Sequence, residues 1–197
     1  MEIRSFLAFE LPAEIKGVVS RVSEELKKSP LDVRRVKTEN IHLTVVFLGN
    51  VPEEHISPVG EAAEEVCQRY SPFNVSLKGA GVFGSKKRPR VLWIGLEGDM
   101  DRMSCFRDDL QKGLAIFGIK QEKRRFRPHL TLGRFRKDSR ADARLDEFLS
   151  SNGDLTSPVC PVGELFLFRS DLNPGGAVYS KMKSWPLTGE HYGFTQK

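Results

Sequence analysis

An internal repeat constrains the fold of this 197-residue chain more than any other feature of its sequence. Residues 3–49 and residues 90–135 each have the pattern of a strand, an amphipathic helix and a second strand. Apolar residues three to four positions apart indicate the helices, and runs of Val, Ile, Leu and Phe bounded by Gly, Pro or Asn indicate the strands. Each unit is followed by a further helical pattern and a further strand. The sequence therefore predicts two similar halves related by a pseudo-twofold axis.

The order of these elements also predicts the fold class. Hairpin-like returns between strands favour an α+β protein with mostly antiparallel sheets flanked by helices. At this length we expect a single compact domain spanning residues 1–197. The expected helices span residues 12–28, 52–70, 100–118 and 139–152, and the expected strands span residues 3–11, 41–49, 73–83, 90–98, 128–135, 157–168 and 176–187.

The second strand of each unit carries the same unusual motif. The stretches "NIHLTVVFLG" and "FRPHLTLGRF" both place a histidine and a threonine two positions apart in an apolar run. Side chains two apart in a strand share a face, so His42 is expected beside Thr44 and His129 beside Thr131. Pseudo-symmetry then allows the two pairs to face each other across a central cleft. Conversely, Leu43, Val45 and Phe47 are expected on the opposite face, against helices.

Two facing imidazoles suit general acid–base chemistry. A pKa near 6.5 lets one histidine be neutral while the other is protonated, and threonine hydroxyls can donate to non-bridging phosphate oxygens. This combination fits in-line attack on a phosphodiester without a metal. A single His–Thr pair is more often a structural detail, but repetition favours a functional reading for His42 and His129. Zinc is disfavoured because each strand offers one ring and no H-x-H pattern or neighbouring cysteine. His55 and His191 are expected to be bystanders.

Charge and cysteine content indicate which kind of partner and which cellular compartment to expect. The net charge is +5, and basic residues gather in residues 33–37, 86–90, 123–127 and 134–140. Such clusters favour an anionic partner, of which nucleic acid is the common one, although solvated loops would have the same composition. No apolar run reaches the roughly 20 residues of a membrane helix, and early charges disfavour a secretory signal. Three scattered cysteines favour reduced thiols. We therefore expect a cytoplasmic monomer that does not bind membranes.

The motifs and their flanks resemble the RNA 2',3'-cyclic phosphodiesterases, also called 2'-5' RNA ligases, of the two-histidine phosphoesterase superfamily. The resemblance rests on "RSFLAFELP", "ENIHLTVVFLG", "GVFGSKKRPRVLWIGL", "FRPHLTLGRF" and "LFLFRSDLNPGGAVYSKMKSWPL", and covers nearly the whole chain. It implies a bilobal fold in which H-x-T-x tetrads at residues 42–45 and 129–132 line a central groove. Two positions, Arg35 and Gly84, depart from the tryptophan and proline that are common in the family.

The resemblance also implies an activity and roles for residues. It implies hydrolysis of RNA 2',3'-cyclic phosphate ends to 2'-phosphates without a cofactor, with His42 as proton donor and His129 as the base that activates water. In reverse, the reaction would join such an end to a 5'-hydroxyl. Thr44 and Thr131 would bind the phosphate, and Arg134 matches an arginine often found after the second tetrad.

Two questions stay open at the level of sequence. Strict alternation puts Arg134 on the face opposite His129, so a bulge at Gly133 is required, whereas Arg127 already has the right parity. Two alternative functions are open. The protein could bind RNA ends, such as those of tRNA fragments, without catalysis, or it could be a phosphodiesterase for small cyclic nucleotides.

Overall fold

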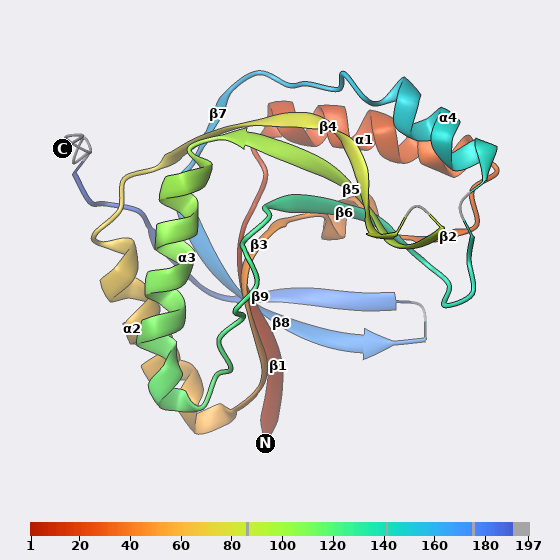
Figure 1. Ribbon diagram of the computed structural model, residues 1–197. Coiled ribbons are helices and arrows are strands. Elements are labelled where there is room, and N and C mark those ends of the chain that lie inside the picture. The colour runs from red at the N-terminus through yellow and green to blue at the C-terminus, as the bar shows by residue number, and fades with distance from the viewer. Residues whose placement is uncertain (86, 141, 175, 191–197) are drawn as a thin grey trace.

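The computed structural model describes residues 1–85, 87–140, 142–174 and 176–190, and within these ranges two antiparallel sheets form the framework (Figure 1). His191 and Lys86 lie outside the described residues. The first sheet has the strand order β3-β1-β8-β9 and the second sheet the order β2-β6-β5-β4-β7. The strands of the first sheet are β1 (Glu2–Phe9), β3 (Leu43–Pro52), β8 (Glu164–Asn173) and β9 (Gly176–Pro186). Those of the second are β2 (Val33–Arg35), β4 (Phe73–Ser85), β5 (Arg88–Gly98), β6 (His129–Phe135) and β7 (Cys160–Val162).

Helices cover the outer face of each sheet (Figure 1). Helices α1 (Ala13–Lys28) and α4 (Ala143–Ser151) lie over the second sheet, and α2 (Ile56–Cys67) and α3 (Met100–Leu114) lie beside the first. Phe106 of α3 packs against Phe9 of β1, with ring centroids 5.8 Å apart. Gly60 of α2 faces Trp185 of β9, where a Cβ would come within 3.0 Å of the indole. The predicted α+β class with antiparallel sheets is confirmed. No helix in the described ranges is long and apolar enough to cross a membrane.

The two repeated units exchange elements. Strand β4 follows the first unit in sequence but pairs with β5 of the second unit, and β8 follows the second unit but pairs with β1 of the first. Helix α1 likewise follows β1 of the first sheet in sequence and yet packs over the second sheet (Figure 1). Each sheet is therefore completed by chain from the other half.

The structure differs from two sequence-based expectations, and both differences reflect this exchange of elements. The strand expected over residues 157–168 is divided at Gly163 into β7, at the edge of the second sheet, and β8, inside the first. Val162 and Leu165 are both buried, so the apolar pattern of the sequence continues across the point where the chain passes from one sheet to the other. The basic segment 33–37, expected as a loop, contains the short edge strand β2.

Helix ends also differ from the expected ones. Helix α4 begins at Ala143 rather than near residue 139, because the Asp142 carboxylate accepts hydrogen bonds from the backbone N–H groups of Arg144 and Leu145 and so caps the helix. Pro12 precedes α1 as its N-cap instead of occupying its first turn.

Candidate active site

A β-bulge interrupts the strand that carries the first His–Thr pair. Thr44 and Val46 pair with consecutive residues of β1, which leaves Val45 as an extra residue. The extra residue reverses the alternation, so Phe47 returns to the face of Thr44. The expectation that Phe47 faces the helices is therefore wrong: its side chain is 60% exposed and lies 5.9 Å from the ring of Phe6.

An equivalent bulge interrupts the second strand. Thr131 and Gly133 pair with consecutive residues of β5, which leaves Leu132 as the extra residue. Arg134 consequently shares the face of His129 and Thr131. The register thus contains a bulge that brings Arg134 to this face, with Leu132 rather than Gly133 as the extra residue. The two halves differ in the side chain just beyond the bulge, a phenyl ring in the first and a guanidinium group in the second.

Backbone carbonyls orient both imidazoles in the same way. Nδ1 of His42 lies 2.7 Å from the carbonyl oxygen of Asn40, and Nδ1 of His129 lies 2.8 Å from that of Arg127. A carbonyl only accepts hydrogen bonds, so Nδ1–H is the donor in each contact. Nε2 of each ring forms no hydrogen bond within the described residues, so it can exchange a proton with a substrate.

Aromatic side chains surround His42. Its ring stacks on Phe6 at a centroid distance of 4.6 Å and meets Tyr179 edge-on at 5.3 Å. Together with Phe166 and Phe168, these rings form a small apolar cluster on the inner face of the first sheet. Burial lowers the pKa of His42 to about 4, although the hydrogen bond to the Asn40 carbonyl opposes the shift.

His129 has a less apolar environment. Its ring meets Phe83 edge-on with a centroid distance of 4.7 Å. Burial lowers its pKa, the hydrogen bond to the Arg127 carbonyl raises it, and the positive charge of Arg134 lowers it further. Both imidazoles are therefore neutral at neutral pH in the free protein. An anionic phosphate bound between them would favour the protonated form of either ring.

One cavity joins the two halves. It has a volume of about 560 Å³ and contains Thr44 from the first sheet together with His129 from the second. His42, Thr131 and Arg134 do not line this cavity. Strand register places Thr131 and Arg134 on the inner face of the second sheet, and the contact with Phe6 places His42 on that of the first. Its other lining residues are Val45, Val46, Phe47, Phe83, Arg107, Gln111, Lys120, Glu122, Arg124, Arg125, Phe126 and Arg127.

The basic loop between α3 and β6 forms much of the cavity wall and is fixed by a buried arginine. The Arg107 side chain of α3 is 7% exposed, and its guanidinium donates to the carbonyl oxygens of Glu122 and Arg124, the shortest contact being 3.0 Å. It also lies 5.3 Å from the centroid of the Phe126 ring. The Gln111 Oε1 atom accepts a hydrogen bond of 2.6 Å from the Glu122 N–H. Arg107 was not predicted from the sequence, because an arginine on an amphipathic helix looks like a solvated charge.

The described residues contain no group of three or more His, Cys, Asp or Glu side chains that could hold a metal ion. Imidazole, hydroxyl, guanidinium and ammonium groups on the cleft faces outnumber the carboxylate of Glu122 at the cavity wall. All of the former can donate hydrogen bonds, which suits an anionic ligand.

The fold and this site define a class of protein: a two-sheet α+β protein whose pseudo-symmetric halves each present a histidine and a threonine from one bulged strand. The chain matches the profile of the 2'-5' RNA ligase superfamily over residues 8–174, and it belongs to that family. The resemblance in the sequence motifs is thereby confirmed.

Relatives match along almost the whole chain. A protein of Methanothermobacter thermautotrophicus named RNA 2',3'-cyclic phosphodiesterase is 32% identical, and the match covers 95% of this chain and 100% of the relative. A protein of Thermotoga maritima with the same name is 33% identical, with 95% and 97% covered.

Solved structures share the fold. TT0787 of Thermus thermophilus superposes with a TM-score of 0.78 at 26% identity and covers 96% of this chain and 100% of its own. Escherichia coli LigT complexed with 3'-AMP gives a TM-score of 0.74 at 28% identity, with 95% and 99% covered.

Proposed function

We propose that this protein is a hydrolase that opens RNA 2',3'-cyclic phosphate ends to 2'-phosphomonoesters. The observation that carries the proposal is the paired placement of two histidines on inner sheet faces, each with Nδ1 bound to a carbonyl and Nε2 free. Relatives named RNA 2',3'-cyclic phosphodiesterase at about 30% identity support a hydrolase of this class.

The proposed reaction is an in-line displacement at phosphorus. Nε2 of His129 takes a proton from water, whose oxygen forms the new bond to phosphorus. The bond from phosphorus to the 3'-oxygen breaks, and Nε2 of His42 gives its proton to that oxygen. Two proton transfers of this kind each contribute roughly 10²–10⁴-fold to the rate. The step requires no metal ion.

Neutral donors would hold the charge that develops on the phosphate. The hydroxyls of Thr44 and Thr131 donate to the non-bridging oxygens, one from each half. Arg134, and Arg127 at the wall of the cavity, neutralise the anion. The bound anion also raises the pKa of His42, which makes the ring a competent acid despite its lowered pKa in the free protein.

With a 5'-hydroxyl in place of water, the same groups would join a cyclic phosphate end to that hydroxyl. His129 would again act as base, now on the 5'-hydroxyl, His42 would again protonate the leaving 3'-oxygen, and a 2'-5' bond would form without a nucleotide cofactor. Hydrolysis predominates in dilute solution because water is in large excess over RNA ends.

RNA is the favoured substrate, tRNA fragments included. The exposed ring of Phe47 offers a surface on which an unpaired base can stack. Arg124 and Arg125 bring positive charge to the cavity wall. Small cyclic nucleotides are the second candidate, because the cavity volume of about 560 Å³ also suits a mononucleotide. We place the protein in the cytoplasm, since Cys67, Cys105 and Cys160 are free thiols.

The test is turnover with EDTA present, using a 2',3'-cyclic-phosphate oligonucleotide and the corresponding mononucleotide. We expect a 2'-phosphate product, and a loss of about 10²-fold or more in kcat for His42→Ala and for His129→Ala, with folding intact. His55→Ala is the control and should leave kcat unchanged. Activity that disappears in EDTA and returns with a divalent ion would overturn the metal-free mechanism.

A further inference from the structure

Strand β2 adds an arginine to the face of the second sheet that carries His129. In the antiparallel register, Arg34 of β2 pairs directly with Arg134 of β6. Directly paired residues point to the same face of a sheet, with Cβ atoms about 4.5–5.5 Å apart. Because the bulge turns Arg134 to the face of His129, Arg34 lies on that face as well.

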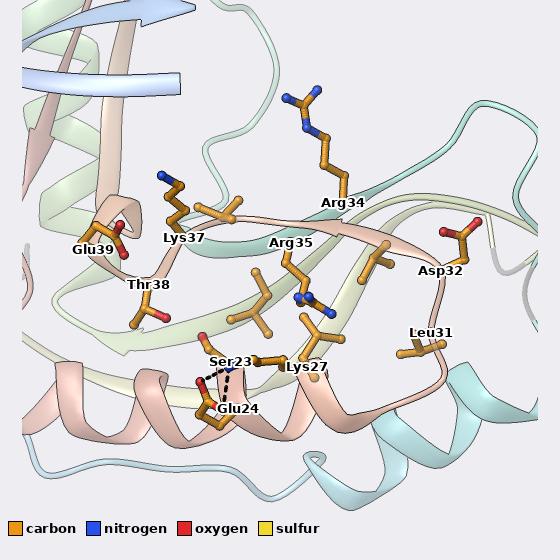
Figure 2. Close-up of a pocket in the computed structure, with 14 residues that line it drawn as sticks. Ser23, Glu24, Lys27, Leu31, Asp32, Arg34, Arg35, Lys37, Thr38 and Glu39 are labelled. Carbon is orange, nitrogen blue, oxygen red and sulfur yellow. Dashed lines mark hydrogen bonds and ion pairs between the residues drawn. The ribbon is translucent and has the colours of Figure 1, made fainter. Parts of the chain in front are cut away.

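The neighbouring residue points the other way. Figure 2 shows a second cavity, of about 650 Å³, between α1 and β2, and the side chain of Arg35 extends from the strand toward it. The side chain of Arg34 leaves the strand on the opposite side (Figure 2). The side chains of two adjacent arginines on one strand therefore point toward different surfaces of the molecule, although both residues contribute to the lining of the second cavity.

The Arg34–Arg134 pair is electrostatically unfavourable in the free protein. Like charges directly opposite each other destabilise a sheet. Among the described residues, no carboxylate forms an ion pair with either arginine, and the nearby Asp32 carboxylate pairs with Arg136 at 3.7 Å. Both arginines are exposed. Two adjacent guanidinium groups without a counter-charge form a ready site for a phosphate, which would remove the repulsion.

The position of the pair indicates which phosphate it would bind. The reacting phosphate lies at the His–Thr pairs, and Arg134 is close enough to His129 to lower its pKa. Arg34 lies one strand farther out, about 4.8 Å toward the sheet edge and away from β5. The pair thus extends the positive surface from the reaction centre toward the adjoining part of an RNA strand.

We infer that Arg34 binds the 5'-phosphate of the terminal nucleotide, the group that links it to the rest of the RNA, and that Arg134 lies between this phosphate and the reacting one. This inference rests on the proposed function and names a determinant of its substrate. The protein should therefore prefer a cyclic-phosphate nucleotide that carries a 5'-phosphate, as in every oligonucleotide, over a nucleoside 2',3'-cyclic phosphate.

The experiment compares two substrates that differ only in this group: adenosine 2',3'-cyclic phosphate with and without a 5'-phosphate. The wild-type protein should show a higher kcat/KM for the 5'-phosphorylated substrate. Arg34→Gln should reduce that preference by roughly tenfold, as expected for one charge-assisted hydrogen bond. The same variant should turn over the unphosphorylated substrate within about twofold of wild type, and Arg34→Lys should keep part of the preference.

Arg35→Gln is the matched control, because it removes the same charge from the same strand on the other face. It should leave the preference unchanged. Two outcomes would overturn the inference and leave the proposed function intact. One is a wild-type kcat/KM that is the same for both substrates, and the other is an equal effect of Arg34→Gln and Arg35→Gln on the preference. Failure of the wild-type protein to turn over either substrate would instead overturn the proposed function and the inference with it.

Discussion

In the proposed mechanism, the threonine near each histidine gives a neutral hydroxyl donor to a phosphate oxygen. Thr44→Val and Thr131→Val preserve the shape of the strand and remove only this donor. We expect each variant to lose about 2–4 kcal/mol of transition-state stabilisation, the range for one oxyanion donor, while Thr→Ser substitutions remain mild. The measurement is kcat/KM with a cyclic-phosphate dinucleotide. Full activity of both valine variants would mean that the phosphate is held by other groups.

The environment of His42 links stability to pH. Its pKa of about 4 lies below the ordinary value of 6.5, so the unfolded chain binds a proton that the folded protein does not bind between these values. The contribution of the neutral ring to stability is complete above pH 6.5 and is lost as the pH falls through about 4, with an upper limit on the order of 3 kcal/mol. Urea unfolding at a series of pH values should show this loss, and His42→Gln should flatten it. An unchanged pH dependence in the variant would assign the acid sensitivity to other groups.

The candidate residues of the site were predictable in part. The His–Thr parity and the need for a bulge before Arg134 follow from the two-residue period of a strand. The face of Phe47 was mispredicted because the bulge at Val45 has no signature among aliphatic residues. Arg34 escaped notice because a strand of three residues is too short to show a period.

At the scale of elements, the loop between α3 and β6 depends on Arg107. Arg107→Met would leave the carbonyls of Glu122 and Arg124 without their donor, so the loop should loosen. We expect faster amide hydrogen exchange over residues 119–128 and a KM for oligonucleotides raised about tenfold.

Arg102→Met provides the matched control for this prediction. Arg102 is another largely buried arginine of α3, but its partners are Asp99 and Ser71 rather than the loop. It should leave the exchange of residues 119–128 unchanged. Loop protection that persists in Arg107→Met would show that the apolar contacts of Phe126 suffice.

Elements with long periodic patterns were predicted well, and those that depend on tertiary pairing were not. The amphipathic pattern of residues 12–28 is fixed by local burial. The division of residues 157–168 between two sheets is decided by partners distant in sequence, and an apolar run carries no information about which sheet it joins.

At the scale of the whole molecule, the exchange of strands and helices makes the two lobes interdependent. We propose that residues 1–197 unfold as one cooperative unit. The chain has two tryptophans, Trp93 in β5 of the second sheet and Trp185 in β9 of the first, so each sheet has its own fluorescent reporter. In Trp93→Phe and Trp185→Phe, the remaining tryptophan should report the same urea midpoint as the circular dichroism of that variant. Fluorescence and circular dichroism midpoints that differ within one variant would indicate lobes that unfold separately.

The two bulges have a consequence for which of the two ester bonds of a cyclic phosphate would open. A cyclic phosphate can open at either of its two ester bonds, and a site made of two equivalent halves would accept it in either orientation and release a mixture of isomers. The side chain just beyond each bulge removes this degeneracy, because Phe47 offers an apolar ring where Arg134 offers a positive charge. In the proposed reaction, one half would therefore favour the base and the other the phosphate chain, and only one orientation would satisfy both. The same local irregularity, repeated in two places, would then give a symmetric scaffold a single product.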